Sequence, residues 1–394
     1  MPSALRANIT FPTRYRFGWG RRSELVAEAR AAGIHRALVV TDRGVAAQPW
    51  FPALAATLAD ELGAEVVDGV STNPTEPEVL EGVAAYRAHG CDGVIAIGGG
   101  SPMDAAKVVA LLAGHGAGAP GDAAAFALGG DRARGIRGDA IRPIVCVPTT
   151  SGTGSELSIG AVISDPAAKV KRTLLHAGLM PRAVVADPEV TLGLPAAVTA
   201  ATGLDALTHA IEALCAPGYH PMCDAIALEA ARLIVRHLPR AVATPRDGDA
   251  RAQLMMAASM AAVAFQKGLG LVHAMAHPLG AATGVHHGLA NAVLLPLVLD
   301  VNRDAIGDAC GRLLAALDAP AGAGDPVDAV IATIRALEAE VGLPATLPAP
   351  AGDLDGACGE LAALAMDERL YLATNPRKVA PVEIATIYRR AFGA

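Results

Sequence analysis

The residues with the clearest chemical potential in this chain are an aspartate and several histidines in its second half. Seven of the eleven histidines lie between residues 209 and 287. The segment ATGLDALTHAIEAL places Asp205 and His209 four residues apart, and VHAMAH repeats that spacing with His273 and His277. Residues four apart lie on one face of a helix, so each pair can present two side chains to the same ion. The spacing therefore predicts helices that hold a metal.

Two more histidines, His286 and His287, follow in the segment TGVHHGLANAVLLP. One carboxylate with three imidazoles suits Fe(II) or Zn(II), because both accept mixed nitrogen and oxygen ligands, whereas Mg(II) and Ca(II) prefer oxygen. A single histidine on an apolar face is more often a hydrogen-bonded core residue, but this clustering favours a metal site. The HExxH pattern of metalloproteases is absent.

A glycine-rich turn follows an apolar run in GVIAIGGGSPMDAAK. Gly98, Gly99 and Gly100 let the backbone approach a ligand closely, and the helix that follows offers free N–H groups to a phosphate. We expect Ser101 to be the N-cap of that helix, with Asp104 three residues later. A dinucleotide pyrophosphate is the natural ligand, although a tight turn with an ordinary cap explains the glycines equally well. The strict GxGxxG pattern is absent.

A second candidate loop, PTTSGTGSELS, follows another apolar run and carries several hydroxyl side chains, among them Thr149, Thr150 and Ser155. Hydroxyls on such a loop can bind ribose, phosphate or the nicotinamide amide. They can equally be turn formers that bond their own backbone.

Asp42 ends the run RALVVTD near the start of the chain. A carboxylate at the end of such a strand accepts hydrogen bonds from the adenosine ribose and repels a 2'-phosphate, which favours NAD over NADP. The alternative is that Asp42 caps the next helix.

The elements that must position these residues change type along the chain. Short β-branched runs alternate with amphipathic helical patterns through about residue 190, which predicts a parallel sheet flanked by helices. The runs expected to be strands are RALVVTD, GAEVVDGV, DGVIAIGGG, RPIVCVPTT and RAVVADP. After them, Ala/Leu-rich helical stretches continue to the end. We expect an α/β dinucleotide-binding domain over residues 1–190 and an all-helical metal-binding domain over residues 191–394, and we expect residues 114–138 to form a mobile surface loop without chemistry.

Charge and composition exclude several classes of protein. Acidic residues number 39 against 32 basic ones, and no Lys/Arg run is present, so nucleic acid is not an expected partner. No signal-peptide pattern opens the sequence, and the longest apolar run, LMMAASMAAVAF, is too short to span a bilayer, so no membrane association is expected. Six cysteines without a CxxC pair fit reduced thiols and a cytoplasmic protein.

Several segments resemble, in order and spacing, the signature segments of the iron-containing alcohol dehydrogenases. The resemblance extends from about residue 10 to the NPR at residues 375–377. It implies an α/β dinucleotide-binding domain, an all-helical domain and an active site in the cleft between them. It also implies NAD, a divalent metal (Fe(II) first, Zn(II) as the alternative), a small alcohol or aldehyde as substrate, and a homodimer or higher oligomer. The segments are GGGSPMDAAK, PTTSGTGSE, DPEVTLGLP, ATGLDALTHAIEA and GLVHAMAHPLGAATGVHHGLANAVLLP.

The resemblance also implies roles for individual residues. Asp205, His209, His273 and His287 become the metal ligands, with His287 chosen because it directly precedes the Gly-x-Ala-Asn of the family motif. His286 is then a bystander.

His277 would lie beside the nicotinamide and is the candidate for relaying the proton, although it can also be a packing residue that shapes the pocket. The implied cofactor contacts are Asp42, Gly98, Gly99, Gly100, Ser101, Asp104, Thr149, Thr150, Ser155 and Lys171.

Three other readings stay open from the sequence. The maleylacetate reductases are similar in fold but depart at the metal motif, whereas all four ligands are present here. A dehydroquinate synthase-like lyase also uses NAD and a divalent metal, but the helical half has few basic residues in its motifs for a phosphate-bearing substrate. A metallohydrolase leaves GGGSP and PTTSGTGSE without a ligand.

Overall fold

The structure is a computed structural model that describes residues 11–165, 168, 170–318 and 324–394. The described residues divide into two compact units, Phe11–Gly193 and Leu194–Ala394. The first unit is built on a sheet and the second consists of helices, which confirms the predicted fold class.

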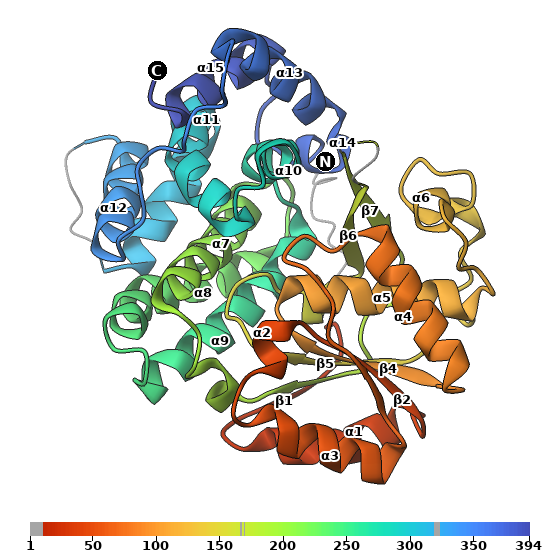
Figure 1. Cartoon of the computed structure of the whole chain (residues 1–394). Helices are drawn as coiled ribbons and strands as arrows, with labels where there is room; N and C mark the ends of the chain where they lie inside the picture. The colour runs from red at the N-terminus through yellow and green to blue at the C-terminus, as the bar shows by residue number, and fades with distance from the viewer. Residues whose placement is uncertain (1–10, 166–167, 169, 319–323) are drawn as a thin grey trace, which may run out of the picture. The chain divides into compact units, whose positions relative to one another are not determined.

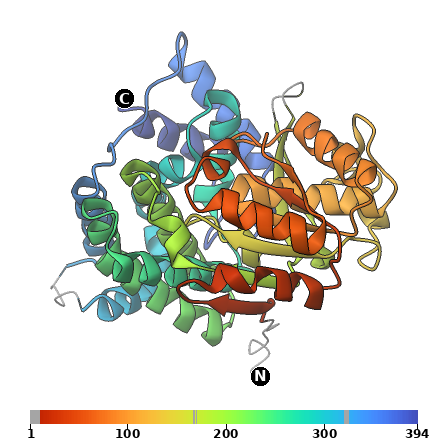
Figure 2. The ribbon, with the colours of Figure 1, turned by 60° about the horizontal axis from the view of Figure 1, so that its bottom comes forward.

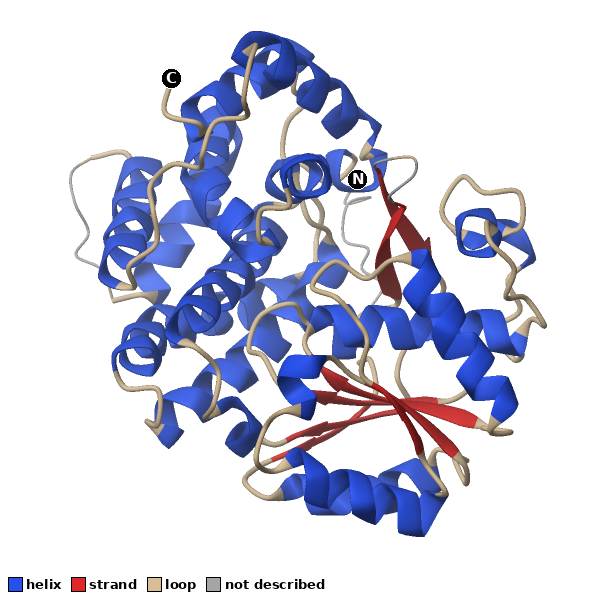
Figure 3. Cartoon of the chain, viewed as in Figure 1, coloured by secondary structure: helices blue, strands red, loops and turns tan. Residues whose placement is uncertain are grey.

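A six-stranded sheet forms the centre of the first unit (Figure 3). Its strand order is β1-β8-β5-β4-β2-β3, and all neighbouring strands are parallel. Each of the five runs predicted as strands contains one of them. The edge strand β1 was not predicted, because its sequence RYRF has no apolar run. The strands are β1 (Arg14–Phe17), β2 (Ala37–Val40), β3 (Glu65–Val67), β4 (Gly93–Gly98), β5 (Ile144–Pro148) and β8 (Ala183–Ala186).

Helices cover both faces of this sheet (Figure 1). Successive residues of a strand point to opposite faces. Val94 and Ala96 of β4 pack in the core that α4 and α5 share, whereas Ile95 and Ile97 pack in the core that α1 and α3 share. This burial on both sides explains why the strands are continuous apolar runs and do not alternate. The helices are α1 (Leu25–Ala31), α2 (Arg43–Ala46), α3 (Phe51–Leu62), α4 (Glu76–Ala88) and α5 (Gly100–Gly114).

The first unit also contains a hairpin that the sequence pattern did not predict. Strands β6 (Gly160–Asp165) and β7 (Val170–Leu175) pair antiparallel with each other and not with the main sheet. Only a few of their residues are fully buried, so the sequence carries a weak strand pattern there.

The segment 114–138, predicted as a mobile surface loop without chemistry, contains short helical elements. Helix α6 (Asp122–Phe126) and a 3-10 turn (Ala133–Gly135) lie within it. Phe126 is 2% exposed, and Asp122 accepts hydrogen bonds from the backbone N–H groups of Gly118 and Ala119. A buried aromatic ring and a bonded carboxylate fix the backbone in a stretch whose Gly and Ala content indicated a loop.

The second unit consists of helices (Figures 1 and 2), most of which contact α7 or α11. Among the described residues no single helix is long and apolar enough to cross a membrane; Gly248–Lys267 and Leu271–Thr283 reach that composition only as a pair, bent by 109°. The helices are α7 (Ala196–Cys215), α8 (Pro221–Ala243), α9 (Gly248–Ala264), α10 (Leu271–Thr283), α11 (His287–Ala316), α12 (Pro326–Glu340), α13 (Leu354–Asp367), α14 (Arg369–Leu372) and α15 (Pro381–Ala391).

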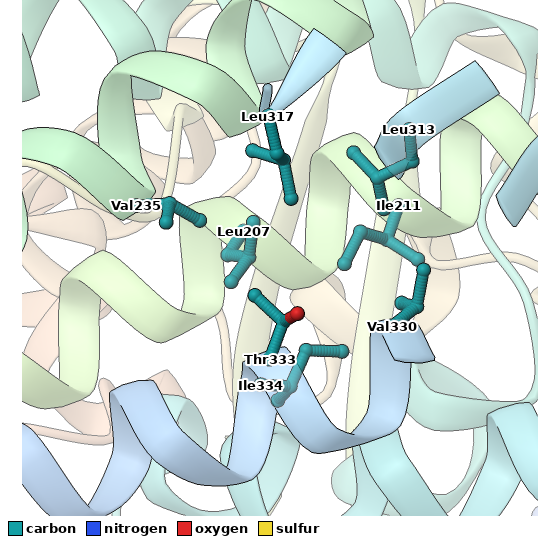
Figure 4. Close-up of a pocket in the computed structure, with 8 residues that line it drawn as sticks. All are labelled: Leu207, Ile211, Val235, Leu313, Leu317, Val330, Thr333 and Ile334. Atoms are coloured by element: carbon teal, nitrogen blue, oxygen red, sulfur yellow. The ribbon is translucent and has the colours of Figure 1, made fainter. Parts of the chain in front are cut away.

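A small apolar recess lies among α7, α8, α11 and α12 (Figure 4). Leu207 and Ile211 of α7 line it. Leu207 lies on the side of that helix opposite Asp205, because residues two apart are about 200° apart around a helix. Its volume of about 10 Å³ is that of a single water-sized sphere. The recess is therefore a packing gap and not a substrate pocket.

Candidate functional site

Helix α7 carries the predicted Asp205 and His209 pair inside the second unit. The two side chains are buried, 2% and 5% exposed respectively. Nε2 of His209 lies 3.8 Å from Oδ1 of Asp205. The four-residue spacing thus brings an imidazole and a carboxylate to one buried point.

Helices α10 and α11 bring two more imidazoles to the same carboxylate. Nε2 of His273, in the first turn of α10, lies 3.9 Å from Oδ1 of Asp205, and Nε2 of His287, the first residue of α11, lies 3.7 Å from it. The ligand atoms of Asp205, His273 and His287 all lie within 4.8 Å of one another. His286 is the N-cap residue of α11.

These distances fit a shared ion better than direct hydrogen bonds. The three Nε2 to Oδ1 separations of 3.7, 3.8 and 3.9 Å exceed hydrogen-bond range. Ligand atoms about 2.1 Å from a tetrahedral ion stand roughly 3.4 Å apart, which is close to what is observed. Asp205, His273 and His287 form a group that could hold an ion, and His209, which is not part of that group, adds a third imidazole 3.8 Å from Asp205. Fe(II) and Zn(II) accept one carboxylate with imidazoles as donors. The residues present therefore fit a divalent metal ion.

Glu212, also on α7, holds the far side of the His273 ring. Its Oε2 lies 2.6 Å from Nδ1 of His273, and its Oε1 accepts a 2.7 Å hydrogen bond from the N–H of Val272. An ionised carboxylate only accepts hydrogen bonds, so Nδ1 carries the proton and Nε2 keeps the lone pair that a metal ion needs. Glu212 thus fixes the tautomer of His273.

Asn291, one turn after His287 on α11, is fully buried beside the same cluster. Its Nδ2 donates to Oδ1 of Asp205 at 2.6 Å and lies 3.1 Å from Nε2 of His287. This approach of α11 to α7 requires Gly288, because a Cβ there would lie 2.3 Å from the backbone oxygen of Ala201. Within the described chain, Oδ1 of Asn291 has no hydrogen-bond partner. Asn291 thus contacts the cluster through its amide nitrogen, which links Asp205 to His287.

His277 follows one turn after His273 on α10, and its side chain is 6% exposed. Its ring centroid lies 5.5 Å from that of His287 and 5.0 Å from that of Tyr371, whose ring it meets edge-on. Its Nδ1 lies 3.5 Å from Oε1 of Glu368, whose side chain is 22% exposed. This imidazole is therefore next to both the histidine cluster and a carboxylate that reaches solvent.

In the first unit, the glycine turn joins β4 to α5 as predicted, but the helix starts earlier. Helix α5 begins at Gly100 with Gly99 as its N-cap residue, so the prediction that Ser101 is the N-cap was wrong. The hydroxyl of Ser101 instead donates to the backbone oxygen of Thr72. The glycine N-cap supplies the extended conformation without a side chain, which leaves the first N–H groups of the helix open to a ligand.

The two predicted cofactor loops lie against each other. The N–H of Thr149 donates to the backbone oxygen of Gly98 at 2.9 Å. A Cβ on Gly100 would come within 2.9 Å of Thr153, and one on Gly99 within 3.2 Å of Thr150. The hydroxyl of Thr150 is buried and, among the described residues, has no hydrogen-bond partner. The glycines are thus needed for close packing of the loops, and Thr150 offers a polar atom suited to a bound cofactor.

Asp104 and Ser155, both predicted cofactor contacts, are bonded to each other, and Ser155 is also bonded to Lys107, which was not predicted. Oγ of Ser155 donates to Oδ1 of Asp104 at 2.6 Å and lies 2.9 Å from Nζ of Lys107. That Nζ also lies 2.6, 2.9 and 2.7 Å from the backbone oxygens of Ser155, Ser158 and Gly160. Burial lowers the pKa of Lys107 and raises the pKa of Asp104, and their mutual attraction opposes both shifts. These side chains hold the loop in place.

The last two predicted cofactor residues, Asp42 and Lys171, follow or lie on strands of the first unit. Oδ1 of Asp42 accepts a 2.9 Å hydrogen bond from the N–H of Val45, so Asp42 is the N-cap of α2. The capping role that the sequence left open is therefore present, and it uses one carboxylate oxygen. Lys171 lies on β7 opposite Ser164.

Comparison with known proteins covers both units. The model of the family "Iron-containing alcohol dehydrogenase" matches residues 12–188, and that of "Fe-containing alcohol dehydrogenase family, C-terminal" matches residues 199–392. The chain belongs to the iron-containing alcohol dehydrogenase family. This dehydrogenase is accordingly an oxidoreductase, and membership of the family implies NAD(H), a divalent metal ion and a small-molecule substrate.

Curated relatives of this dehydrogenase match it over most of their length. It is 43% identical to the 4-hydroxybutyrate dehydrogenase of Cupriavidus necator, over 80% of this chain and 84% of that protein. It is 37% identical to the 1,3-propanediol dehydrogenase of Klebsiella pneumoniae, over 95% of this chain and 96% of that protein.

Solved structures of the family are similar to the fold of this dehydrogenase. A 1,3-propanediol oxidoreductase gives a TM-score of 0.89 at 34% identity, covering 98% of this chain and 100% of that one. A sulfoacetaldehyde reductase from Bifidobacterium kashiwanohense, in complex with NAD+, gives 0.86 at 27% identity, covering 99% and 100%.

Several polar residues around the predicted sites of this dehydrogenase were missed from the sequence. Glu212 and Asn291 carried a usable signal, since they stand at i+7 from Asp205 and i+4 from His287 and so continue the same helix faces. Glu368 reaches His277 only through the tertiary fold and carried no local signal. The full set is Lys107, Glu212, Asn291, Glu368 and Tyr371.

Proposed function

We propose that this chain is an NAD-linked dehydrogenase of short primary alcohols whose divalent ion is held by Asp205, His209, His273 and His287. The proposal is carried by the convergence of three imidazole Nε2 atoms on one buried aspartate oxygen. In this proposal residues 1–190 serve as the dinucleotide-binding domain and residues 191–394 as the metal-binding domain.

When bound, the ion polarises the substrate oxygen as a Lewis acid and NAD(H) accepts or donates the hydride. Asp205 contributes the negative charge of the ligand set, and Glu212 keeps the lone pair of its neighbour His273 available. His277 takes the proton released from the alcohol and passes it from Nδ1 to Oε1 of Glu368, 3.5 Å away. The partial exposure of Glu368 lets that proton reach solvent, and aldehyde reduction uses the same route in reverse.

We assign the cofactor to the two loops of the first unit. The glycines and the open N-terminus of the 15-residue helix α5 suit a pyrophosphate. The threonine hydroxyls suit the ribose or the nicotinamide amide, and Asp42 suits the adenosine ribose, which favours NAD over NADP. Asp104 and Ser155 act by holding the loop, as their internal hydrogen bonds support. The assigned residues are Asp42, Gly98, Gly99, Gly100, Ser101, Asp104, Thr149, Thr150, Ser155 and Lys171.

The names of the relatives support a narrower substrate class. 4-Hydroxybutyrate and 1,3-propanediol are both short, unbranched primary alcohols with a second polar group at the far end. We propose a substrate of that class, or its aldehyde. We further propose Fe(II) as the ion, with Zn(II) as the alternative, a homodimer or higher oligomer, and a cytoplasmic location, which six unpaired cysteines support.

The ligand assignment is tested by two neighbouring histidines that serve as a matched pair. His287→Ala should lose the metal, measured by elemental analysis, and with it turnover, while NADH still binds. His286→Ala should keep both. If His286→Ala loses metal and His287→Ala retains it, the assignment is wrong by one residue; if neither loses metal, the metal site is not here.

The cofactor and the substrate need separate measurements. Fluorescence titration with NADH separates a dehydrogenase from a metallohydrolase, which has no use for the dinucleotide. A panel of ω-hydroxy, ω-carboxy and unsubstituted C2–C6 alcohols and aldehydes, assayed with added Fe(II) or Zn(II), should give the highest kcat/KM for the ω-substituted C3 and C4 members. Equal values for the unsubstituted compounds would refute the substrate class, and light scattering tests the oligomer.

A further inference from the structure

The start of α10 is stabilised by residues far from it in sequence. Its N-cap residue is Gly270, which has no side chain to accept the first N–H groups of the helix. The N–H of Leu271 donates to Oδ1 of Asn375 at 3.1 Å, and that of Val272 to Oε1 of Glu212 at 2.7 Å. A Cβ on Gly270 would come within 3.0 Å of both acceptor oxygens. Glycine at this position lets two side chains cap the helix that carries His273.

Asn375 also joins α10 to α11, and all of its hydrogen-bonding capacity is used. Besides the N–H of Leu271, its Oδ1 accepts from Nδ2 of Asn302 at 3.0 Å. Its Nδ2 donates to Oδ1 of Asn302 at 3.1 Å and to the backbone oxygen of Arg377 at 2.7 Å. Asn302 lies on α11, the helix that begins at His287. The two asparagines are 6% and 4% exposed, so water competes little for these bonds.

The residues on either side of Asn375 hold it in place from both directions. The hydroxyl of Thr374 donates to the backbone oxygen of Leu269, in the turn before α10. A Cβ on Gly268 would lie 2.5 Å from Cβ of Thr374, so the two segments are in close contact. Nε of Arg377 donates to the backbone oxygen of Val301 on α11 at 2.8 Å. The segment Thr374–Arg377 is thus bonded to the start of α10 and to the middle of α11.

We infer that Asn375 is a positioning residue for the metal centre. It bonds the N–H of Leu271 on α10 and the side chain of Asn302 on α11. These bonds fix the position of His273 on α10 relative to His287 on α11. The inference rests on the proposed function, since it presumes that His273 and His287 bind the ion together. It gives the TNPR segment near the end of the chain a role in metal binding. A change of a few tenths of an ångström in α10 moves His273 directly, because only one turn of helix separates it from the cap.

The test measures Co(II) affinity of the metal-free enzyme by competition with a chelator, together with the visible absorption of the Co(II) form, which reports its coordination. Asn375→Ala should weaken Co(II) binding about 10- to 100-fold, as loss of a residue that orients a ligand does elsewhere, and should change the Co(II) spectrum. Asn302→Ala should act in the same direction. The double variant should lose less than the sum of the two, because each removes the same pair of bonds.

The matched control is Asp247→Ala, which removes the N-cap of α9 in the same unit. It should lower Tm, as loss of a cap does, without changing Co(II) affinity, because α9 carries no proposed ligand. If Asn375→Ala lowers Tm but binds Co(II) as the wild type does, Asn375 is only structural and the inference fails. An equal loss of affinity in Asp247→Ala also overturns it.

Failure of the inference is distinguishable from failure of the proposed function. If the wild type binds no Co(II), or His273→Ala binds it as well as the wild type does, the metal assignment falls and the inference with it. If His273→Ala loses Co(II) and Asn375→Ala keeps it, only the inference falls. Should Asn375→Ala fail to fold, Asn302→Ala decides alone: unchanged Co(II) affinity overturns the link between α10 and α11.

Discussion

Replacing Glu212 by glutamine tests whether a single carboxylate sets the tautomer of His273, a proposed metal ligand. Both oxygens of Glu212 accept hydrogen bonds, one from the N–H of Val272 at 2.7 Å and one from Nδ1 of His273 at 2.6 Å. Glutamine has only one acceptor oxygen. If its amide nitrogen faces Val272, two donors oppose each other. If it faces His273, Nδ1 must accept, the imidazole proton moves to Nε2, and the lone pair directed at the ion is lost.

The expected loss follows from that geometry. Substitution of a residue that orients a metal ligand costs about 10- to 100-fold in affinity, which is about 1.4 to 2.7 kcal/mol. Glu212→Ala leaves the imidazole free to keep its tautomer with a water molecule as acceptor. Glu212→Gln, although it is the closer match in shape, should therefore weaken metal binding at least as much as Glu212→Ala.

The assay is chelator competition for Zn(II) or Co(II), with NADH affinity measured in parallel. Glu229→Gln on α8, which breaks only a surface pair with Arg232, is the matched control and should bind metal as the wild type does. NADH affinity should stay unchanged in all three variants, because the proposed cofactor loops belong to the first unit. Near wild-type metal affinity in Glu212→Gln would refute the tautomer argument.

Three further predictions concern the cofactor loops and stability. Asp42→Gly should reduce the ratio of kcat/KM for NAD to that for NADP by about tenfold or more, equivalent to about 1.4 kcal/mol. Asp42→Ser keeps a capping oxygen without the charge and should reduce this ratio in the same way. If the ratio is unchanged, Asp42 is only the cap of α2. Lys107→Met should leave the three backbone oxygens around Nζ without a donor, at a cost of about 1–3 kcal/mol each. Urea unfolding should therefore show an unfolding free energy lower by at least ~3 kcal/mol, and NADH affinity should fall. A decrease of less than ~1 kcal/mol would contradict the role given to Lys107. Burial raises the pKa of Glu338 from 4.5 to about 7, and Oε1 has no hydrogen-bond partner among the described residues. Between about pH 4.5 and 7 the folded state therefore keeps a proton that the unfolded state has lost. The contribution of Glu338 to the free energy of unfolding is fully present below about pH 4.5 and is lost as the pH rises through about 7. The loss amounts to about 3 kcal/mol, at 1.36 kcal/mol per pKa unit. Glu338→Gln should be more stable than the wild type at pH 8 and should show a flatter dependence of unfolding free energy on pH; parallel curves for the two proteins would count against it.

Local patterns in the sequence were enough to predict the class of fold and the groups that could bind a metal. Five strands were predicted because a parallel strand covered on both faces must be a continuous apolar run, and Val94 to Ile97 of β4 are buried on both sides. The Asp205 and His209 pair was visible because helical periodicity places residues four apart on one face. The same periodicity, extended further, reaches Glu212 and Asn291.

Local patterns failed where a long-range contact overrode them. Ser101 has the sequence of an N-cap, but the close packing of the glycine turn against the second loop starts α5 one residue before it, and its hydroxyl bonds Thr72 instead. Residues 114–138 have the composition of a loop, but burial of Phe126 fixes a short helix there. In both cases a contact with a distant segment outweighed a propensity of about 1 kcal/mol or less.

The sequence by itself predicted which side chains could bind a metal or a phosphate and determined on which elements they lie, because those properties depend on residue type and on spacing within one helix or turn. Only the tertiary structure decided which distant residues hold them in position. Glu368 meets His277, and Asn375 caps the helix of His273, from segments about a hundred residues further along the chain. No pattern within a single element encodes such a contact, since it depends on how several helices pack together, and packing selects one partner among many residues of the same type.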